Sequence, residues 1–395
     1  MDINNRLYPA ICCVGYNRPE SMRRLLHSIG RGVYCVNNIP LIISIDESSL
    51  SNEVERVAKE FEWNFGEKII RRFSSRLGLR KHSLLCGDLS VKYGAVIFLE
   101  DDVVVAPGFY EFTLQSLDFY RGSPKVFGIS LYNQKWVSEM RCEFNPAYQG
   151  NDVYFIRRDI SRGQCWIGEQ WNKFKTWFEA HENNLPESCS EIPISILKWP
   201  DKTSWSKYMS FYLVEQDLYY VVPYFSFSTN MSEIGSHTYI RSDICQVQLS
   251  EYRETIYKFV HYDKAIIYDS FFERKDRFIE KIKDIPISEI CMDLNGLKYD
   301  FSNYNYVLTT KELGGKNLCS YGIHMEPIEA NIIYDVHGED IFLYKVAKMT
   351  KTMAPYSMRR GRLEHVLSKY TSIDLSRIIT IKIRNRIFTI LGLKK

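Results

Sequence analysis

Apolar runs of strand length alternate with helical patterns through the first 131 residues, and this alternation constrains the fold more than any other feature of the chain. The strands are expected at residues 9–14, 40–45, 68–73, 95–99 and 126–131. The helices are expected at residues 19–29, 54–63 and 81–93, with a fourth that begins at Pro107. Strands separated by helices of this length predict an α/β fold, in which parallel strands are covered by helices on both faces.

Three adjacent acids follow the fourth predicted strand. Glu100, Asp101 and Asp102 come directly after Ala95–Leu99, and Val103 continues the chain with further apolar residues. Because adjacent carboxylates repel one another and resist burial, we expect the strand to deliver them to a water-exposed edge. A divalent cation that is held by one or two carboxylates keeps coordination sites open for a diphosphate. A plain acidic turn would explain the same three residues.

Two further strand ends point to the same edge of the predicted sheet. Gly15, Tyr16, Asn17 and Arg18 follow the first strand, and Asp46 follows the second. Ligands of parallel α/β sheets bind beyond the carboxyl ends of the strands. The convergence of these ends predicts a nucleotide site.

Composition bounds the class of protein. The chain has 395 residues, of which 45% are hydrophobic and 25% charged, as in ordinary globular proteins. It has no run of 18 uncharged apolar residues, and its first residues do not resemble a signal peptide. Its 10 cysteines include no C-x-x-C pair, which predicts reduced thiols and a cytoplasmic location.

Positive charge is concentrated at the C-terminus. Residues 345–395 hold 13 of the 51 Lys and Arg residues and only 2 of the 48 acids, so the body is net negative. A general nucleic-acid surface is therefore not expected. A helical stripe in this tail predicts either peripheral contact with an anionic membrane surface or docking on the body. The stripe consists of Ile379, Ile383, Ile387, Ile390 and Leu391, with Arg377, Lys382, Arg384 and Arg386 between them.

We expect three parts along the chain. Residues 1–245 would form the nucleotide-binding domain, residues 246–345 a smaller β-rich region, and residues 346–395 the basic tail. Apolar patches such as Asn331–Val336 favour strands in the second part.

Five short segments occur in an order and spacing that resemble those of a known enzyme class. They span residues 14–20, 77–82, 99–102, 162–166 and 234–238. Over about residues 8–240 the chain resembles glycosyltransferases of the GT-A fold, close to the family-2-type enzymes of bacterial surface-polysaccharide synthesis, with Glu100-Asp101-Asp102 as a variant of their DxD motif. The resemblance implies a Rossmann-like nucleotide-binding mixed sheet with helices on both faces.

The resemblance also implies a metal site. Asp102 would bind Mn²⁺ or Mg²⁺, and His237 would complete the metal or phosphate site. Asp101 would face the ribose or assist the metal, and Glu100 would lie near the donor sugar. A lone histidine such as His237 also serves structural roles in many proteins.

Further residues are implied in donor binding. The loop of Gly15, Tyr16, Asn17 and Arg18 would border the base pocket, and Asp46 would lie by the base or the ribose. Other contacts would come from Arg76, Arg80 and Lys81 to the diphosphate, from the backbone of Gly163 to the donor sugar, and from Trp166 at the acceptor side. The alternative to a diphosphate contact is that some of these cations are solvated residues of a helix. The alternative for Trp166 is a place in the core.

The catalytic base is the least defined part of the predicted site. An inverting transfer needs a carboxylate to take the proton of the acceptor hydroxyl. The resembling enzymes often carry an Asp directly after a Trp, where this chain has Ser206 after Trp205. Asp201 is the nearest candidate, and Glu169 and Asp217 are others.

The sequence thus predicts a metal-dependent hexosyl- or N-acetylhexosaminyltransferase. It would move a sugar from a nucleotide donor, a UDP-sugar, to a hydroxyl of a glycan that is lipid-linked, at the inner face of a membrane. A sugar nucleotidyltransferase is a second possibility, although the loop at Gly15 lacks the additional glycines that cradle a triphosphate. A non-catalytic glycan-binding protein on a decayed transferase fold is a third.

Overall fold

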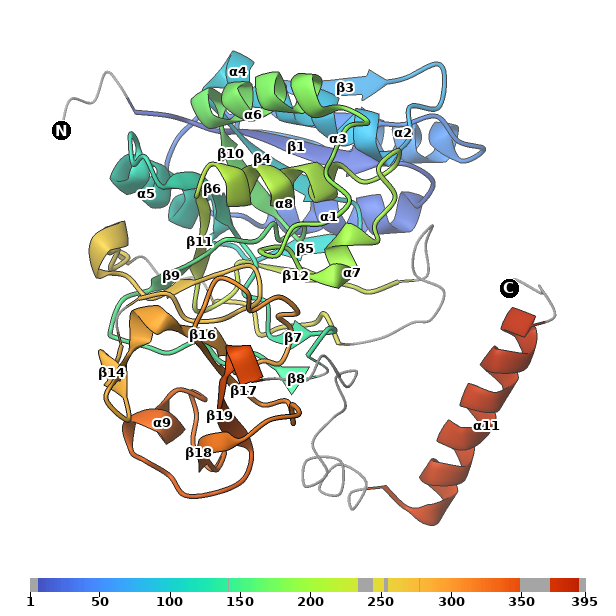
Figure 1. The fold of residues 1–395 in the computed structure, drawn as a ribbon. Helices are drawn as coiled ribbons and strands as arrows, with labels where there is room; N and C mark the ends of the chain where they lie inside the picture. The colour runs from blue at the N-terminus through green and yellow to red at the C-terminus, as the bar shows by residue number, and fades with distance from the viewer. Residues whose placement is uncertain are drawn as a thin grey trace.

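The structure, a computed structural model, describes residues 6–140, 142–233, 244–251, 255–276, 278–348 and 370–390. Its centre is a nine-stranded sheet in the order β13-β9-β11-β6-β10-β4-β1-β2-β3 (Figure 1). The strands of this sheet are β1 Ala10–Gly15, β2 Leu41–Ile45, β3 Lys68–Arg72, β4 Ala95–Glu100, β6 Val126–Ser130, β9 Val153–Ile156, β10 Gln164–Ile167, β11 Tyr219–Pro223 and β13 Ile267–Tyr268. The expected α/β architecture with a mixed sheet is confirmed.

Parallel pairing brings three strand ends together. β1 lies between β2 and β4, and all three run in the same direction. Gly15 pairs with Ile45 on one side of β1, and Val14 pairs with Glu100 on the other. The carboxyl ends of β1, β2 and β4 therefore meet at one edge, as predicted.

The sheet is mixed because β10 is antiparallel to both of its neighbours and β9 is antiparallel to β11. Gln164 pairs with Phe98, and Ile167 pairs with Ala95. β10 therefore begins at the edge where β4 ends, and it finishes at the opposite edge.

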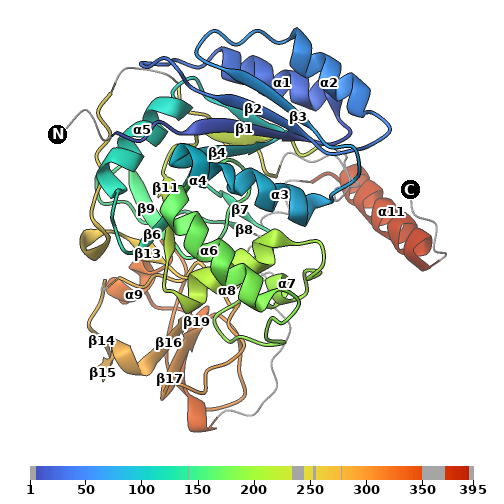
Figure 2. The ribbon, with the colours of Figure 1, turned by 90° about the horizontal axis from the view of Figure 1, so that it is seen from above.

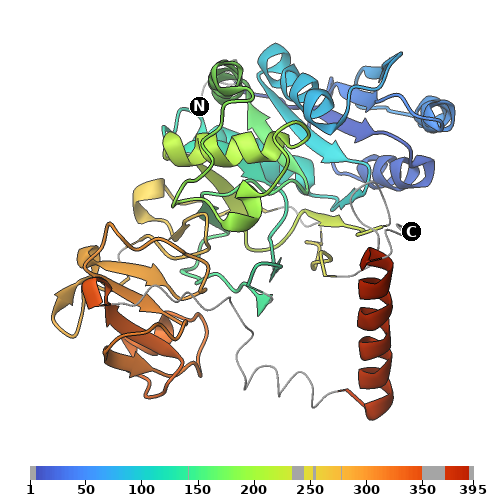
Figure 3. The same cartoon turned by 45° about the vertical axis from the view of Figure 1, so that its right-hand side comes forward.

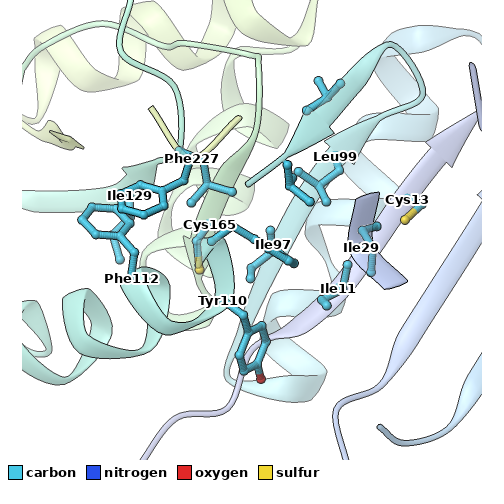
Figure 4. Packing of buried hydrophobic residues seen from close by; sticks show 14 of the residues in the cluster. Ile11, Cys13, Ile29, Ile97, Leu99, Tyr110, Phe112, Ile129, Cys165 and Phe227 are labelled. Atoms are coloured by element: carbon cyan, nitrogen blue, oxygen red, sulfur yellow. The ribbon is translucent and has the colours of Figure 1, made fainter. Parts of the chain in front are cut away.

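Helices cover both faces of the sheet. Figure 2 shows α1 and α2 on one side of β1–β3 and α3 and α4 on the other. The helices are α1 Pro19–Gly30, α2 Ser51–Glu60, α3 Leu79–Gly87, α4 Leu89–Tyr93, α5 Phe109–Tyr120, α6 Gly168–His181, α7 Ile194–Leu197, α8 Trp205–Glu215, α9 Ala330–Ile333 and α11 Ser372–Ile390. Between the sheet and α1, α2 and α5 lies a core that includes Ile97 and Leu99 (Figure 4). Phe98 and Trp166 belong to a second core on the opposite face, with α3, α6 and α8.

One predicted helix is divided. The helix expected at residues 81–93 is two helices, α3 and α4, which meet at Asp88. The side chain of Asp88 accepts hydrogen bonds from Trp171 (2.9 Å) and Lys175 (2.8 Å) of α6. A Cβ at Gly87 would stand 1.9 Å from the Trp171 ring, so this glycine permits the close approach of α6. This long-range packing is not visible in local helical periodicity.

The large sheet continues past the predicted boundary near residue 245, because β13 pairs with β9. A separate four-stranded sheet follows, in the order β16-β17-β19-β18, and this region is β-rich as expected. Its strands are β16 Ile290–Asp293, β17 Tyr306–Thr309, β18 Asn317–Tyr321 and β19 Ile341–Lys345, and short pairs elsewhere are β5 Val103–Val105 with β12 Ser228–Asn230, β7 Trp136–Val137 with β8 Cys142–Glu143, and β14 Lys281–Ile282 with β15 Ile285–Pro286.

The strand expected from the apolar patch Asn331–Val336 is wrong. The patch contributes to α9, a single helical turn. The side chain of Asn331 accepts hydrogen bonds from the backbone of His324 and Met325 and donates to the carbonyl of Ile328. These local bonds fix a turn where the apolar residues alone indicated a strand.

The helix predicted in the basic tail is present as α11, which stands apart from the rest of the molecule (Figure 3). The side chains of Ile379, Ile383 and Ile387 are exposed, so they do not cover the core of the body. The side chain of Ile390 and residue Leu391 lie outside what the structure describes. Of the helices in the described ranges, none combines the length and apolar character that a bilayer span requires.

Candidate active site

The acidic triplet lies at the end of β4 together with the loop that follows β1. The guanidinium group of Arg18 forms an ion pair with Asp101, and it lies 3.4 Å from a carboxylate oxygen of Asp102. Arg18, which was predicted to border a base pocket, thus neutralises part of the triplet. One arginine thus faces three carboxylates.

The prediction that the triplet lies at a water-exposed edge is wrong for Asp101. Asp101 is only 4% exposed, and Glu100 is partly buried. Burial raises the pKa of Asp101 to about 6, although the charge of Arg18 opposes this shift. Burial, followed by the charges of Asp102 and Asp101, raises the pKa of Glu100 to about 8. The ion pair with Arg18, and not water, compensates the buried charge of Asp101.

Asp102 combines one carboxylate oxygen that faces Arg18 with a second that is buried and unpaired. Arg18 contacts its Oδ2 atom, whereas its Oδ1 atom is buried and has no hydrogen-bond partner within the described residues. Buried polar atoms are nearly always paired, so this carboxylate oxygen is free to take a ligand that the described residues do not supply. The described part of the chain contains no cluster of three or more His, Cys, Asp or Glu side chains that could hold a metal. These donors fit a cation that takes its remaining ligands from phosphate and water.

A short strand, β12, lies beside the segment that follows the triplet. β12 pairs antiparallel with β5, which follows Asp102 directly, and the backbone N–H of Met231 donates to the Asp102 carbonyl at 2.8 Å. Glu233 accepts hydrogen bonds from Ser21 and Arg24 of α1. His237, predicted to complete the site, lies outside the described residues.

Asp46 shapes the loop between β3 and α3. The carboxylate is buried and accepts hydrogen bonds from the backbone N–H groups of Leu77 (2.7 Å) and Gly78 (3.0 Å). These contacts hold in place the loop that carries Arg76. Asp46 therefore positions the loop between β3 and α3, and this role does not depend on a contact with a ligand.

A ring and a cation lie side by side at this edge. The guanidinium carbon of Arg76 is 4.9 Å from the centre of the Tyr16 ring. Asn17 adjoins this pair and is partly exposed, whereas Gly15 is buried at the end of β1. Such a pair suits stacking and hydrogen bonding with a planar ligand.

Arg80 forms its hydrogen bonds within the chain, with segments that flank α6 and α8. Its guanidinium donates to the carbonyl oxygen of Asp201 and to the carboxylate of Glu182, each at 2.8 Å. Lys81 is exposed at the start of α3. The Arg80 guanidinium therefore links α3 to the segments around α6 and α8.

Two predictions for the β10 segment change with the structure. Trp166 has no exposed surface and stacks between Phe98 and Trp171, so its ring belongs to the core and not to the wall of an acceptor site. Gly163 has a φ of +99°, and a Cβ there would stand 2.9 Å from the hydroxyl of Ser228. Backbone conformation and packing against Ser228 therefore require glycine at position 163, independently of the predicted contact with the donor sugar.

The three candidate bases lie away from the triplet or are already paired. Asp201 is well exposed and its carboxylate lies 2.6 Å from Lys207. Glu169 follows β10 and Asp217 precedes β11, so both are at the opposite edge of the sheet. In place of these, the structure brings a different carboxylate close to Glu100.

That carboxylate is Asp159, which the sequence analysis did not single out. It accepts hydrogen bonds from Ser206 and from Gln164 (2.9 Å), and its charge contributes to the raised pKa of Glu100. Its nearest sequence signal was the segment at residues 162–166, which begins three residues further along.

No family model and no curated protein matches the chain. Among solved structures, S. aureus TarS (residues 1–349) in complex with UDP gives a TM-score of 0.37 at 9% identity, over 56% of this chain and 59% of that chain. A mannosyltransferase from Pyrobaculum calidifontis, in complex with GDP-Man and Mn²⁺, gives 0.30 at 13% identity, over 43% of this chain and 47% of that chain.

A cytidylyltransferase from Leptospira borgpetersenii gives a TM-score of 0.28 at 10% identity, over 43% of this chain and 64% of that chain. The chain thus spans between about half and just under two thirds of these three solved structures. At these scores the likenesses assign neither a family nor an activity.

Proposed function

We propose that this chain is a glycosyltransferase that uses a nucleotide-sugar donor and a divalent cation. The observation that carries the proposal is the unpaired, buried Oδ1 atom of Asp102 at the carboxyl end of β4. It stands at the edge where ligands of such sheets bind, beside two further carboxylates and one arginine.

Asp102 would hold Mn²⁺ or Mg²⁺, with His237 as a further ligand. When bound, the cation neutralises the charge that develops on a departing nucleoside diphosphate. The residues of the chain bind and orient the donor: Tyr16 and Arg76 offer a ring and a cation to the base. Asp46 keeps the Arg76 loop in place through its two backbone contacts.

The finer assignment follows the sequence prediction. The donor would be a UDP-sugar carrying a hexose or an N-acetylhexosamine, and the acceptor a hydroxyl of a lipid-linked glycan. One direct displacement would invert the anomeric carbon, so the site must supply one base and no nucleophilic side chain.

The test is a donor panel with the purified protein. With Mn²⁺ present, one nucleotide sugar is expected to release nucleoside diphosphate, and EDTA is expected to stop the release. Release of pyrophosphate from a nucleoside triphosphate and a sugar phosphate would instead identify a nucleotidyltransferase. Tight binding of a glycan without turnover of any donor would identify a binding protein.

The basic tail supports a peripheral membrane location as part of this proposal. α11 carries Arg377, Lys382, Arg384 and Arg386 beside exposed isoleucines. Each such cation near an anionic surface contributes about 1 kcal/mol. Replacing Lys382, Arg384 and Arg386 by Gln should therefore release the protein from vesicles that contain phosphatidylserine. Wild-type protein should not bind vesicles of pure phosphatidylcholine. Equal sedimentation of wild type and variant with the anionic vesicles would contradict a membrane role of α11.

A further inference from the structure

Asp159 and Glu100 come from distant segments but face the same side of the sheet. Glu100 follows Phe98 by two residues in β4, so both side chains project to the face covered by α8. Gln164 and Trp166 of β10 share that face by the same alternation. Asp159, in the connection from β9 to β10, reaches this face because it contacts Gln164.

Two donors hold the Asp159 carboxylate in one orientation. Ser206 Oγ donates to Oδ2, and Gln164 Nε2 donates to Oδ1 at 2.9 Å. Gln164 is itself fixed, because its Oε1 atom accepts from the Trp166 indole at 2.8 Å. Ser206 lies in the first turn of α8, two residues after the helix cap at Ser204.

The carboxylate retains the capacity to accept a proton. An ionised carboxylate offers about four lone-pair positions, and the two hydrogen bonds use two of them. Asp159 is 8% exposed, so it is largely buried but retains some solvent-accessible surface. Among the described residues, no lysine or arginine forms an ion pair with Asp159, whereas Asp201 forms one with Lys207.

We propose that Asp159 is the catalytic base of the sugar transfer and that Ser206 is its positioning residue. The inference rests on the proposed glycosyltransferase function and names one of the residues that perform it. The carboxylate that the sequence analysis sought at position 206 is thereby supplied by another segment, and Ser206 orients it.

The acceptor hydroxyl transfers its proton to Asp159, and its oxygen forms a bond to the anomeric carbon of the donor sugar. The bond from that carbon to the diphosphate oxygen breaks, and its electron pair leaves with the nucleoside diphosphate. Asp159 then returns its proton to water. No oxidant or additional reactant is needed.

The charged and titratable surroundings of Asp159 suit this task. Burial raises its pKa to about 6, while the donors Ser206 and Gln164 and the charge of Arg158 oppose the shift. Glu100 of β4 and Tyr220 of β11 also interact electrostatically with it. A base with a pKa near the working pH is mostly ionised there and still takes a proton effectively.

The first test is the variant Asp159→Asn, assayed with Mn²⁺ and the donor that wild type turns over fastest, with water or a simple sugar as acceptor. We expect release of nucleoside diphosphate to fall at least about 100-fold, the usual contribution of a general base. Thermal stabilisation by Mn²⁺ and UDP should persist, which shows that the variant is folded and binds. Asp88→Asn, at the other edge of the sheet, is the matched control and should keep its turnover.

Full turnover by Asp159→Asn would overturn this inference and leave the proposed function standing. The absence of turnover by wild type with every donor would overturn both.

A second variant separates positioning from simple stability. Ser206→Ala removes a donor that stabilises the ionised carboxylate, so the acidic limb of the kcat/KM profile should move to higher pH. A merely structural role of Ser206 would leave that midpoint unchanged, and this result would overturn the assignment even if Asp159→Asn does not fold.

Discussion

Two acidic clusters of this protein contrast in how their charge is compensated. In the C-terminal region, Asp293 is fully buried and lies 3.3 Å from Lys311, while it also accepts hydrogen bonds from Thr309 and from the backbone of Lys298. Asp269 likewise lies 2.8 Å from Lys298. At the end of β4, three carboxylates share one arginine, and one oxygen of Asp102 has no partner among the described residues.

The contrast separates acids whose charge the protein itself compensates from acids that we propose to bind a ligand. A buried charge whose partners are all supplied by the protein stabilises a particular arrangement and needs no ligand. A group of carboxylates that the protein leaves undercompensated costs stability, and such groups are concentrated where ligands bind. Charge count alone would not distinguish the clusters, because both are rich in acids.

The largest expected effect is on activity at the β4 cluster. Asp102→Ala should reduce release of nucleoside diphosphate about 1,000-fold, because the metal would lose its carboxylate ligand. The melting temperature without metal should hardly change. Asp118→Ala, on α5, is the control and should remain active; equal activity of both variants would mean that Asp102 binds no essential cation.

The second effect is on stability at the C-terminal cluster. Asp293→Ala should lower the free energy of unfolding by about 3–5 kcal/mol, because it leaves the buried Lys311 ammonium without its partner. Urea denaturation would measure this loss, with the exposed Asp284→Ala as control. A loss below about 1 kcal/mol would show that this cluster is not the structural counterpart of the β4 site.

The third prediction concerns pH and Asp159. Its folded pKa of about 6 lies above the ordinary value of 3.8, so the folded state binds the proton more tightly than the unfolded state. This contribution to stability is complete below about pH 4 and is lost as the pH rises to 6, a difference of about 3 kcal/mol. Asp159→Asn should remove this part of the pH dependence and be at least as stable as wild type at pH 7. A lower stability of the variant at pH 7, measured by denaturant unfolding, would place Asp159 with the structural acids.

The smallest predicted effect concerns Arg18, the counter-charge of the β4 cluster. Arg18→Met should lower stability by about 2 kcal/mol, because Asp101 is buried and loses its counter-charge. Saturating Mn²⁺ should then stabilise the variant more than wild type, since the cation replaces the missing positive charge. Thermal shifts with and without Mn²⁺ would measure this, with the exposed Arg23→Met as control. An equal response to Mn²⁺ in all three proteins would contradict a cation site beside Arg18.

Much of the fold followed from local patterns. The strands β1, β2, β3, β4 and β6 lie within one or two residues of their predicted bounds, because each is a short apolar run between turn residues. The meeting of three strand ends also followed, since parallel strands of one sheet end at one edge. The division at Asp88 and the turn at Asn331 escaped prediction, because side-chain contacts with other segments or with the local backbone decide them.

The sequence by itself determined that acids stand at the ends of two of the predicted parallel strands, at Asp46 and at the triplet that begins with Glu100. Only the tertiary structure decided which acids are compensated: Arg18 meets Asp101 across 83 residues, and Ser206 meets Asp159 across 47. Local sequence fixes the direction and the end of a strand through periodicity and turn residues. The protonation and the partners of a carboxylate depend on burial and on nearby charges, and long-range packing alone brings those together.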